Sequence, residues 1–242
     1  MARILAIGAH PDDVEIGMAG TVAAHTAAGH EVTIVDLTRG ELSTNGTPAE
    51  RATEALEAAR ILGAERENVG LPDLGFAVDT DSIRALVEVI RRRRPAVILG
   101  PYWEDRHPDH VRCSRLVTEA SFAAGVAKFA PGLPPHRPAL VAYYFINTEA
   151  VPSFVIDVSA HYERKLAALT VHRTQFLRPE GGAGTPLNDP NFLSFVQSRD
   201  RLFGAKTGVT FAEGFVRRGL HRLAGFDDLL GPAAGGGQDE PE

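Results

Sequence analysis

The sequence contains a single cysteine and no long apolar run, and each shortage excludes a class of protein. Its single cysteine, Cys113, cannot form a disulfide within the chain, which excludes a disulfide-stabilised secreted fold and indicates a reducing compartment. The first apolar stretch, Ile4 to Ala9, is too short for a signal peptide or a membrane span. We therefore expect a cytoplasmic protein with no membrane partner.

The chain also has no excess of positive charge. The formal net charge is -6 and the isoelectric point is about 5.9, so the chain lacks the clustered positive charge that binds phosphate backbones, and we expect no nucleic-acid partner. The one basic run, Arg91 to Arg94, stands just before Pro95, where cations favour the carboxyl end of a helix dipole. We interpret this run as a solvated helix end.

Apolar residues are present in sufficient number for one large core. The chain has 242 residues with 44% hydrophobic content, which predicts a single α/β domain over residues 1–230. The remaining residues, 231–242, have almost nothing to bury and are predicted to be a disordered tail.

Strand-like and helix-like segments alternate through the first half of the chain. Apolar or β-branched runs typical of buried parallel strands occupy residues 3–9, 31–38, 67–71 and 96–100. Helical patterns lie between them over residues 14–28, 49–62 and 81–93. This alternation predicts an α/β, Rossmann-like fold: a doubly wound, mostly parallel sheet with helices on both faces.

The second half of the chain is less regular. Its pattern predicts helices over residues 111–129 and 159–174, and strands over residues 140–146 and 154–158. The glycine- and proline-rich segment 178–190 is predicted to be a loop of the length usual for lids.

Two similar motifs follow the first and fourth predicted strands. His10-Pro11-Asp12-Asp13 comes directly after the strand at residues 3–9, and His107-Pro108-Asp109-His110 follows the strand at residues 96–100. Open α/β sheets bind ligands beyond the carboxyl ends of their strands, so both motifs are expected at one ligand site.

A dinucleotide site and a pair of helix caps are alternative explanations of these motifs. Asp36 lies near the end of the second strand, where a ribose ligand could stand, but the glycine fingerprint is missing after Gly8 and the carboxylates there would repel a pyrophosphate. Aspartate and proline are typical of helix N-termini, yet capping explains one such motif better than two at neighbouring strand ends.

A divalent metal ion explains the motifs better than either alternative. Carboxylates crowded with imidazoles repel one another and shift each other's pKa values unless a cation lies between them. Histidine and carboxylate ligands with one position left open to water are typical of a catalytic zinc site. The spacing does not choose the ligands among six suitable residues: His10, Asp12, Asp13, His107, Asp109 and His110.

The sequence resembles the LmbE/PIG-L family of metal-dependent deacetylases, which remove the acetyl group from N-acetylglucosamine conjugates. The similarity lies in GAHPDDVEIGMAGT, TRGELSTNGTPAERATEA and DRHPDHVRCSRLVTEASFAAG, and in the shorter PHRP, YYF and FAEGF. It is greatest to the bacillithiol-pathway branch, which deacetylates N-acetylglucosaminyl-malate. The resemblance implies an LmbE-like fold and a homo-oligomer, a trimer or hexamer.

The resemblance also implies a ligand set for the metal. It makes His10, Asp13 and His110 the ligands of Zn²⁺, and other divalent transition metals can share a site of this composition.

Catalytic roles follow from the same resemblance. Asp12 would be the general base, and a protonated His107, held by Asp109, would stabilise the oxyanion that forms when water attacks the amide. Either Asp12 or His107 would protonate the departing amine.

Two arginines match arginines of related proteins: Arg51 matches one that the family uses to bind sugar, and Arg106 matches one typical of the bacillithiol branch. Arg51 would hold sugar hydroxyls, and either Arg51 or Arg106 could pair with a carboxylate such as malate. Family members often supply a mobile tyrosine near the site, whereas this chain offers phenylalanines after the glycine-rich loop: Phe195, Phe203 and Phe211.

Other polar residues are less informative. The sequence predicts that Cys113 is a small buried side chain, that His172 lies at the surface or the edge of the core, and that the loop residues Glu41, Ser43 and Thr44 line the sugar pocket. Two other functions stay open: deacetylation of another small acetylated amino sugar, of mycothiol type or a chitooligosaccharide, and a non-catalytic metal- or sugar-binding module.

Overall fold

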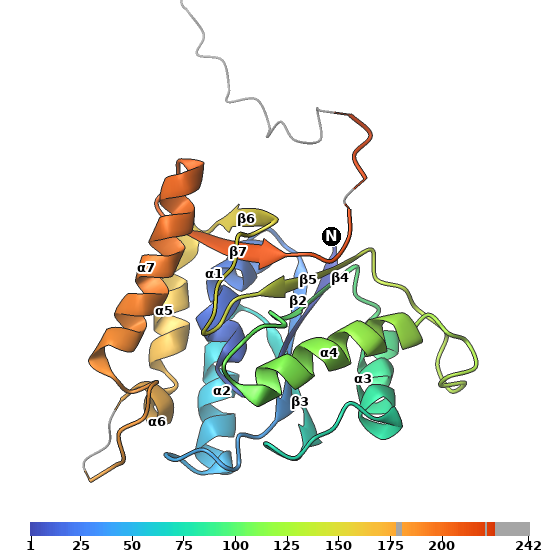
Figure 1. The fold of residues 1–242 in the computed structure, drawn as a ribbon, viewed down its shortest axis with the longest axis horizontal. Helices are drawn as coiled ribbons and strands as arrows, with labels where there is room; N and C mark the ends of the chain where they lie inside the picture. Colours follow the sequence, from blue (N-terminus) through green and yellow to red (C-terminus); the bar gives the residue numbers. More distant parts are fainter. Residues whose placement is uncertain (178–180, 221, 226–242) are drawn as a thin grey trace, which may run out of the picture.

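A seven-stranded sheet forms the centre of the molecule (Figure 1). The computed structural model describes residues 1–177, 181–220 and 222–225. The strand order is β3-β2-β1-β4-β5-β7-β6, with parallel pairing from β3 to β5 and antiparallel pairing of β7 with β5 and β6. The strands are β1 (Arg3–Gly8), β2 (Glu31–Thr38), β3 (Glu65–Leu71), β4 (Val97–Pro101), β5 (Leu140–Tyr144), β6 (Phe154–Asp157) and β7 (Ala212–Val216).

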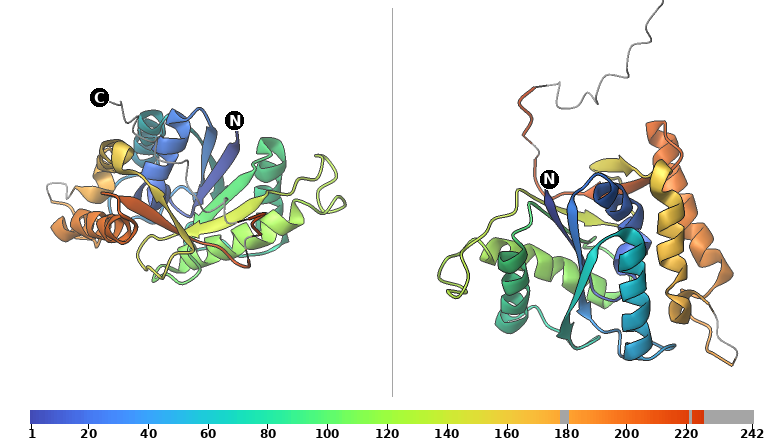
Figure 2. Two further views of the ribbon diagram at one scale, coloured as in Figure 1. Left: turned by 90° about the horizontal axis from the view of Figure 1, so that it is seen from above. Right: turned by 180° about the vertical axis from the view of Figure 1, so that it is seen from behind.

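Helices cover both faces of the sheet (Figure 2). On β1, Ile4 and Ala6 pack in a core with residues of α1, α2, α5 and α7, whereas Leu5 and Ile7 pack with α3 and α4, because successive side chains of a strand point to opposite faces. The predicted doubly wound fold is confirmed. The helices are α1 (Asp13–Ala27), α2 (Pro48–Leu62), α3 (Thr80–Arg93), α4 (Pro108–Ala123), α5 (Tyr162–Thr170), α6 (Arg173–Phe176) and α7 (Pro190–Thr207), with a 3₁₀ turn η1 (Ser159–His161).

The winding direction of the sheet reverses at β1. This strand lies between β2 and β4, and the helices after β1 and β4, α1 and α4, pack on opposite faces. The loop after β1 and the loop after β4 therefore diverge at the carboxyl ends of these strands, where open α/β sheets have their ligand crevice.

Helix α1 is broken at Met18, whose backbone angles (φ −155°, ψ 23°) leave the helical region. In an unbroken helix the N–H group of Gly20 would donate to the carbonyl of Ile16. Here Gly20 and the next residue donate to the carboxylate of Glu213 at 3.0 and 2.6 Å, and Arg199 donates to the Ile16 carbonyl at 2.8 Å. Buried side chains thus replace the backbone partners that the break removes.

These side chains belong to a buried charge cluster that we call the α1 clamp: Lys165, Arg199, Asp200 and Glu213. The Lys165 ammonium lies 2.7 Å from Asp200 and 2.6 Å from Glu213, and all three side chains are fully buried. The clamp comes from α5, α7 and β7, and it supports the first turn of α1.

The prediction of a solvated helix end is confirmed for Arg92 and Arg94, which are exposed, and is wrong for Arg91. Its side chain is only 1% exposed, and it donates to backbone carbonyls of the segment that follows α4, including those of Ala124, Val126 and Leu133. The helix predicted over residues 111–129 instead spans Pro108–Ala123. The guanidinium satisfies the turn carbonyls beyond that helix, which would otherwise be buried without partners.

The segment after β6 also differs from its prediction. The helix predicted over residues 159–174 is divided into η1, α5 and α6, with a break at His172, whose ψ of 59° is not helical. Helix α7 and strand β7 are not anticipated by the sequence reading. A local signal exists for α7, since Asp189 caps the helix and Pro190 occupies its first turn, whereas β7 is a short strand that contains a glycine.

Within the described ranges, no helix combines the length and the apolar character needed to cross a membrane. The predicted tail at residues 231–242 lies outside the described residues, so the division into a domain over 1–230 and a tail stays a prediction.

Candidate active site

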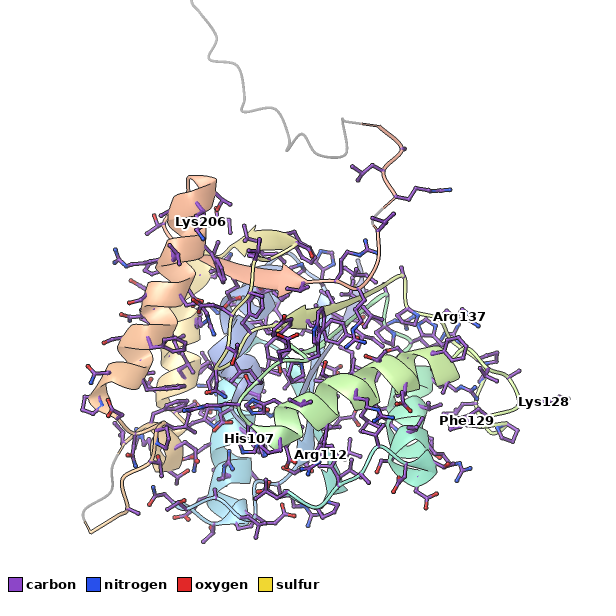
Figure 3. All side chains as sticks on the ribbon, in the orientation of Figure 1. His107, Arg112, Lys128, Phe129, Arg137 and Lys206 are labelled. Carbon is purple, nitrogen blue, oxygen red and sulfur yellow. The ribbon has the colours of Figure 1, made fainter. Side chains whose placement is uncertain are left out.

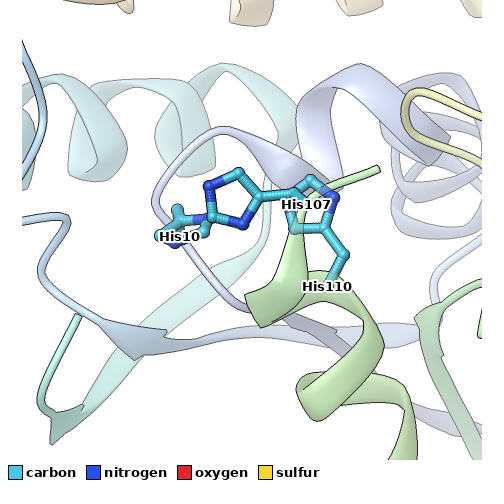
Figure 4. A group of neighbouring side chains, drawn as sticks. All are labelled: His10, His107 and His110. Atoms are coloured by element: carbon cyan, nitrogen blue, oxygen red, sulfur yellow. The ribbon is translucent and has the colours of Figure 1, made fainter. Parts of the chain in front are cut away.

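The loops after β1 and β4 bring the two His-Pro-Asp motifs together. Figure 4 shows His10, His107 and His110 as neighbours, and the ring centroid of His107 lies 4.7 Å from those of the other two. His107 precedes the first turn of α4 (Figure 3). All three histidines line a cavity of about 270 Å³ at the carboxyl edge of the sheet, as the strand-end argument predicts.

The aspartate side chains of the motifs do not cap their helices. Asp12 stands at the N-cap position of α1 without a side-chain capping bond, and the carboxylate of Asp13 accepts from the N–H groups of Ala9 and His10 at 2.8 and 3.0 Å. At the start of α4, the side chain that caps is that of His107. Capping by aspartate therefore does not explain the two motifs.

Asp13 lies between two imidazoles. Its Oδ1 atom is 3.1 Å from Nε2 of His110, and its Oδ2 atom is 3.6 Å from Nδ1 of His10. Ligand atoms of a tetrahedral zinc ion with bonds of about 2.0–2.1 Å stand roughly 3.3 Å apart. The three residues thus have the donor types that a small divalent cation takes, and each imidazole approaches a different oxygen of Asp13.

The charges of this group also fit a cation. Burial would raise the pKa of Asp13, but the facing imidazoles of His110 and His10 hold it well below its usual range. Burial would lower the pKa of His110, but the carboxylates of Asp13 and Asp105 outweigh this effect and raise the pKa to about 9. Protons on the histidines compensate the buried carboxylates here, which a metal ion would do when bound.

Among the described residues two groups place one ligand atom each within 4.8 Å of one another, and neither group contains Asp13. One group is His10, His107 and His110, and the other is His10, Asp73 and Asp109. The resemblance selects Asp13 rather than His107 as the third ligand, and that choice stays a prediction.

Carboxylates lie behind the two histidines that are predicted to bind a metal. Asp73, which follows β3, approaches Nε2 of His10 at 3.2 Å, and Asp105 approaches Nδ1 of His110 at 3.0 Å. Each histidine therefore turns its other nitrogen toward Asp13. The sequence reading does not identify Asp73 or Asp105, although both stand in loops after parallel strands.

Asp12 is strained and buried. Its φ of 138° lies in a region that residues with a side chain rarely adopt, and such strain often occurs at functional sites. Burial raises the pKa of its carboxyl group to about 6, against the opposing effect of Arg51. An acid with a pKa near neutrality suits a group that accepts and returns a proton.

Arg51, on the first turn of α2, is 3% exposed and lines the cavity. It donates to Oδ2 of Asp12 at 3.1 Å and to the carbonyl of Pro11 at 2.7 Å. A side chain on Gly40, whose φ is 61°, would collide with this guanidinium. Arg51 thus has Asp12 as its charged partner, and its predicted contact with sugar hydroxyls stays a prediction.

The predicted contact between His107 and Asp109 takes a different form. The backbone N–H of Asp109, rather than its carboxylate, donates to Nδ1 of His107 at 3.2 Å. The carboxylate accepts from the N–H of Leu74 and from Arg112. Burial lowers the pKa of His107, and the neighbouring histidines add to the effect. A neutral His107 with Nδ1 as an acceptor carries its proton on Nε2.

Arg106 lies at the mouth of the cavity with its side chain exposed. Among the described residues it has no hydrogen-bond or ion-pair partner, in contrast to the buried Arg51. It is therefore free to meet an anion that enters the cavity.

Loops after several strands complete the cavity. Ser43 and Thr44 line it as predicted, whereas Glu41 instead accepts from the N–H of Asp73. The lining residues that the sequence does not single out are Ile16, Leu42, Asp73, Leu74, Ile146 and Asn147, and Gln175, which the sequence places on the same helix face as His172, lines the cavity as well. From the predicted lid loop at 178–190, residues 185–187 line the cavity, and residues 178–180 lie outside the description. Within the described ranges no tyrosine lines it.

Three further predictions can be compared with the structure. Cys113 is fully buried in a core, as predicted. The prediction for His172 is wrong, because its side chain is fully buried 3.6 Å from Glu15. Asp36 is held by Arg66 through two hydrogen bonds of 2.7 and 2.8 Å, so it is not free to bind a ribose.

The chain is similar to known deacetylases. The family model for PIG-L, GlcNAc-PI de-N-acetylase, matches residues 5–121, which contain both His-Pro-Asp motifs. The diacetylchitobiose deacetylase of Thermococcus kodakarensis is 32% identical over 228 residues, covering 88% of this chain and 81% of that protein. The 1D-myo-inositol 2-acetamido-2-deoxy-alpha-D-glucopyranoside deacetylase of Nakamurella multipartita is 32% identical over 241 residues, covering 72% of this chain and 80% of that protein.

A solved structure has the same fold. A conserved protein from Thermus thermophilus superimposes with a TM-score of 0.83 and 37% sequence identity, covering 93% of this chain and 98% of that chain.

Proposed function

Since the chain belongs to the PIG-L family of de-N-acetylases, we propose that it hydrolyses the acetamide group of an N-acetylglucosamine conjugate with the help of a divalent metal ion. The observation that carries this proposal is the placement of Asp12, a strained buried carboxyl group, in the same cavity as His10, Asp13 and His110.

The metal would be held by His10, Asp13 and His110. This set of two imidazoles and one carboxylate suits Zn²⁺, and other divalent transition metals are also compatible with it. When bound, the ion would supply a Lewis acid for the amide carbonyl and would lower the pKa of the attacking water.

Asp12 would act as the general base. It takes a proton from water as the water oxygen forms a bond to the carbonyl carbon, and Arg51 at 3.1 Å keeps its carboxylate in place. The carbon–nitrogen bond then breaks, and the proton goes to the departing amine directly or by way of His107. The products are acetate and the free amino sugar.

His107 would stabilise the oxyanion. With Nδ1 occupied by the Asp109 amide, its Nε2–H is available to donate to the developing negative oxygen. A hydrogen bond of this kind does not require a charged imidazole in the resting protein.

N-acetylglucosaminyl-malate is the substrate we propose within this class. Arg106 supports it, because an exposed guanidinium without a partner at the cavity mouth is suited to bidentate binding of a carboxylate. The bacillithiol-type segments around the two motifs support it as well. Diacetylchitobiose and N-acetylglucosaminyl-inositol are the alternatives, since relatives are named for them.

A substrate panel tests the proposal. Metal-stripped protein is expected to release no amine, and addition of Zn²⁺ is expected to restore release, most rapidly from N-acetylglucosaminyl-malate. Faster turnover of diacetylchitobiose or the inositol conjugate would keep the chemistry and replace the substrate. Metal and sugar binding without turnover on any of the three would instead indicate a binding module.

Replacement of Arg106 tests the carboxylate contact. In Arg106→Ala, KM for N-acetylglucosaminyl-malate is expected to rise about 10- to 100-fold with little change in kcat, because hydrogen bonds to charged groups contribute about 1.5–3 kcal/mol. KM for the uncharged diacetylchitobiose is expected to stay the same. Arg115→Ala is the matched control, since Arg115 is an exposed arginine of α4 outside the cavity. Equal effects on both substrates would argue against the contact.

A further inference from the structure

Asp105 lies in the loop between β4 and α4, two residues before His107, and the catalytic steps above do not use it. Its side chain is only 2% exposed although it carries a carboxylate. We propose that Asp105 is a positioning residue that holds the proton on Nδ1 of His110, so that Nε2 faces the metal. This inference rests on the metal site of the proposed function.

Both carboxylate oxygens of Asp105 are occupied. Oδ1 accepts from the backbone N–H of His107 at 2.8 Å and from the side-chain amide of Asn147 at 2.9 Å, and it lies 3.0 Å from Nδ1 of His110. Oδ2 accepts from the backbone N–H of Asn147 at 3.0 Å. The carboxylate is therefore fixed from two loops and cannot turn away from His110.

The position of this carboxylate decides the roles of the two ring nitrogens. A carboxylate accepts hydrogen bonds, so Nδ1 of His110 must carry a proton to pair with it. When a metal ion is bound, the lone pair would then be on Nε2, the nitrogen that lies 3.1 Å from Oδ1 of Asp13, and among the described residues that oxygen accepts no backbone hydrogen bond. Carboxylates in this position orient histidine ligands and make them more basic.

An amide cannot take the place of this carboxylate. The side chain introduced by Asp105→Asn would have the same shape, but one of its two terminal atoms would be an NH₂ group. In either orientation that NH₂ group would face an N–H donor, from His107 on one side or from Asn147 on the other. The substitution therefore changes the side-chain volume very little but removes at least one hydrogen-bond acceptor that the loop needs.

Zinc affinity separates this role from a merely structural one. Full-length protein is stripped of metal and titrated with Zn²⁺ against a chromophoric chelator, as wild type, Asp105→Asn and Glu104→Gln. Loss of the partner of a ligating histidine is expected to weaken zinc binding about 10- to 100-fold. Glu104→Gln removes one negative charge from the adjacent, exposed position and is expected to leave the affinity unchanged. Equal affinity of wild type and folded Asp105→Asn would overturn the proposal.

A measurement on the wild-type protein covers the case in which Asp105→Asn does not fold. Long-range ¹H–¹⁵N spectra of the zinc-loaded protein report which nitrogen of His110 is protonated. We expect a proton on Nδ1, and a proton on Nε2 would overturn the proposal. If the wild-type protein does not bind zinc, the proposed function fails, and this inference fails with it; if it binds zinc through Nδ1 of His110, only this inference fails.

Discussion

Asp12→Asn is expected to reduce kcat for acetamide hydrolysis by about 10²- to 10⁴-fold while the protein keeps its metal, because general-base catalysis contributes a factor of that size. Asparagine has the shape of aspartate and tolerates unusual backbone angles better than most residues, which suits the φ of 138° at this position. It can still accept a hydrogen bond from Arg51 but cannot take a proton from water. Initial rates and metal content of purified wild type and variant check the prediction.

The pH profile gives an independent test of this role. Burial raises the pKa of Asp12 to about 6, and a bound cation would lower it from there, so kcat/KM of the wild type is expected to rise with pH through an acid limb at or below about pH 6. The variant is expected to lose this limb. Asp81→Asn, at an exposed aspartate in the first turn of α3, serves as the control and should behave like wild type. Full activity of metal-loaded Asp12→Asn would refute the assigned role.

Lys165→Met is expected to destabilise the protein by about 3–5 kcal/mol. The Lys165 ammonium contacts Asp200 and Glu213 at 2.7 and 2.6 Å, and all three side chains are fully buried. Methionine would fill similar space but would leave the buried carboxylate of Glu213 without a cation and that of Asp200 with Arg199 alone, which is the costly way to break a buried ion pair. The loss is large compared with the 5–15 kcal/mol typical of folded proteins.

Urea unfolding followed by circular dichroism measures this loss. Lys206→Met is the matched control, because Lys206 is an exposed lysine near the end of α7 (Figure 3) and should give a midpoint close to that of wild type. Zinc affinity of the folded variant is expected to fall as well, since Glu213 holds the break in α1 whose first turn carries Asp13. A loss below about 1 kcal/mol would mean that the α1 clamp contributes little to stability.

The first half of the fold could be predicted because its signals are local. Buried parallel strands appear as continuous apolar runs, and β1, β2 and β4 lie within one or two residues of their predictions. Later elements depend on distant residues. Helix α4 ends early because the backbone carbonyls of the segment after it accept hydrogen bonds from Arg91 of α3. Arg91 is 33 or more positions away in the chain. A buried arginine with carbonyl partners cannot be distinguished from a solvated one by composition alone.

Some features of the candidate site could likewise be predicted from local sequence signals, and others depend on distant residues. Two motifs at the ends of parallel strands predict a shared cavity, because the carboxyl ends of such strands meet at one edge. Asp73 and Asn147 could not be recognised in advance, since each is a single polar residue in an ordinary loop. Their roles depend on contacts with His10 and Asp105, which are 63 and 42 positions away.

By itself, the sequence determined the α/β class of this protein, the sheet edge at which its chemistry lies and the residue types available there, because strand patterns and short motifs are properties of neighbouring residues. Only the tertiary structure decided how those residues are used. It placed Arg51 on Asp12, the Asp109 amide on His107 and a carboxylate behind each of His10 and His110. The neighbouring residues decide whether a buried group is charged and which ring nitrogen of a histidine carries the proton. Those neighbours come from loops far apart in the chain.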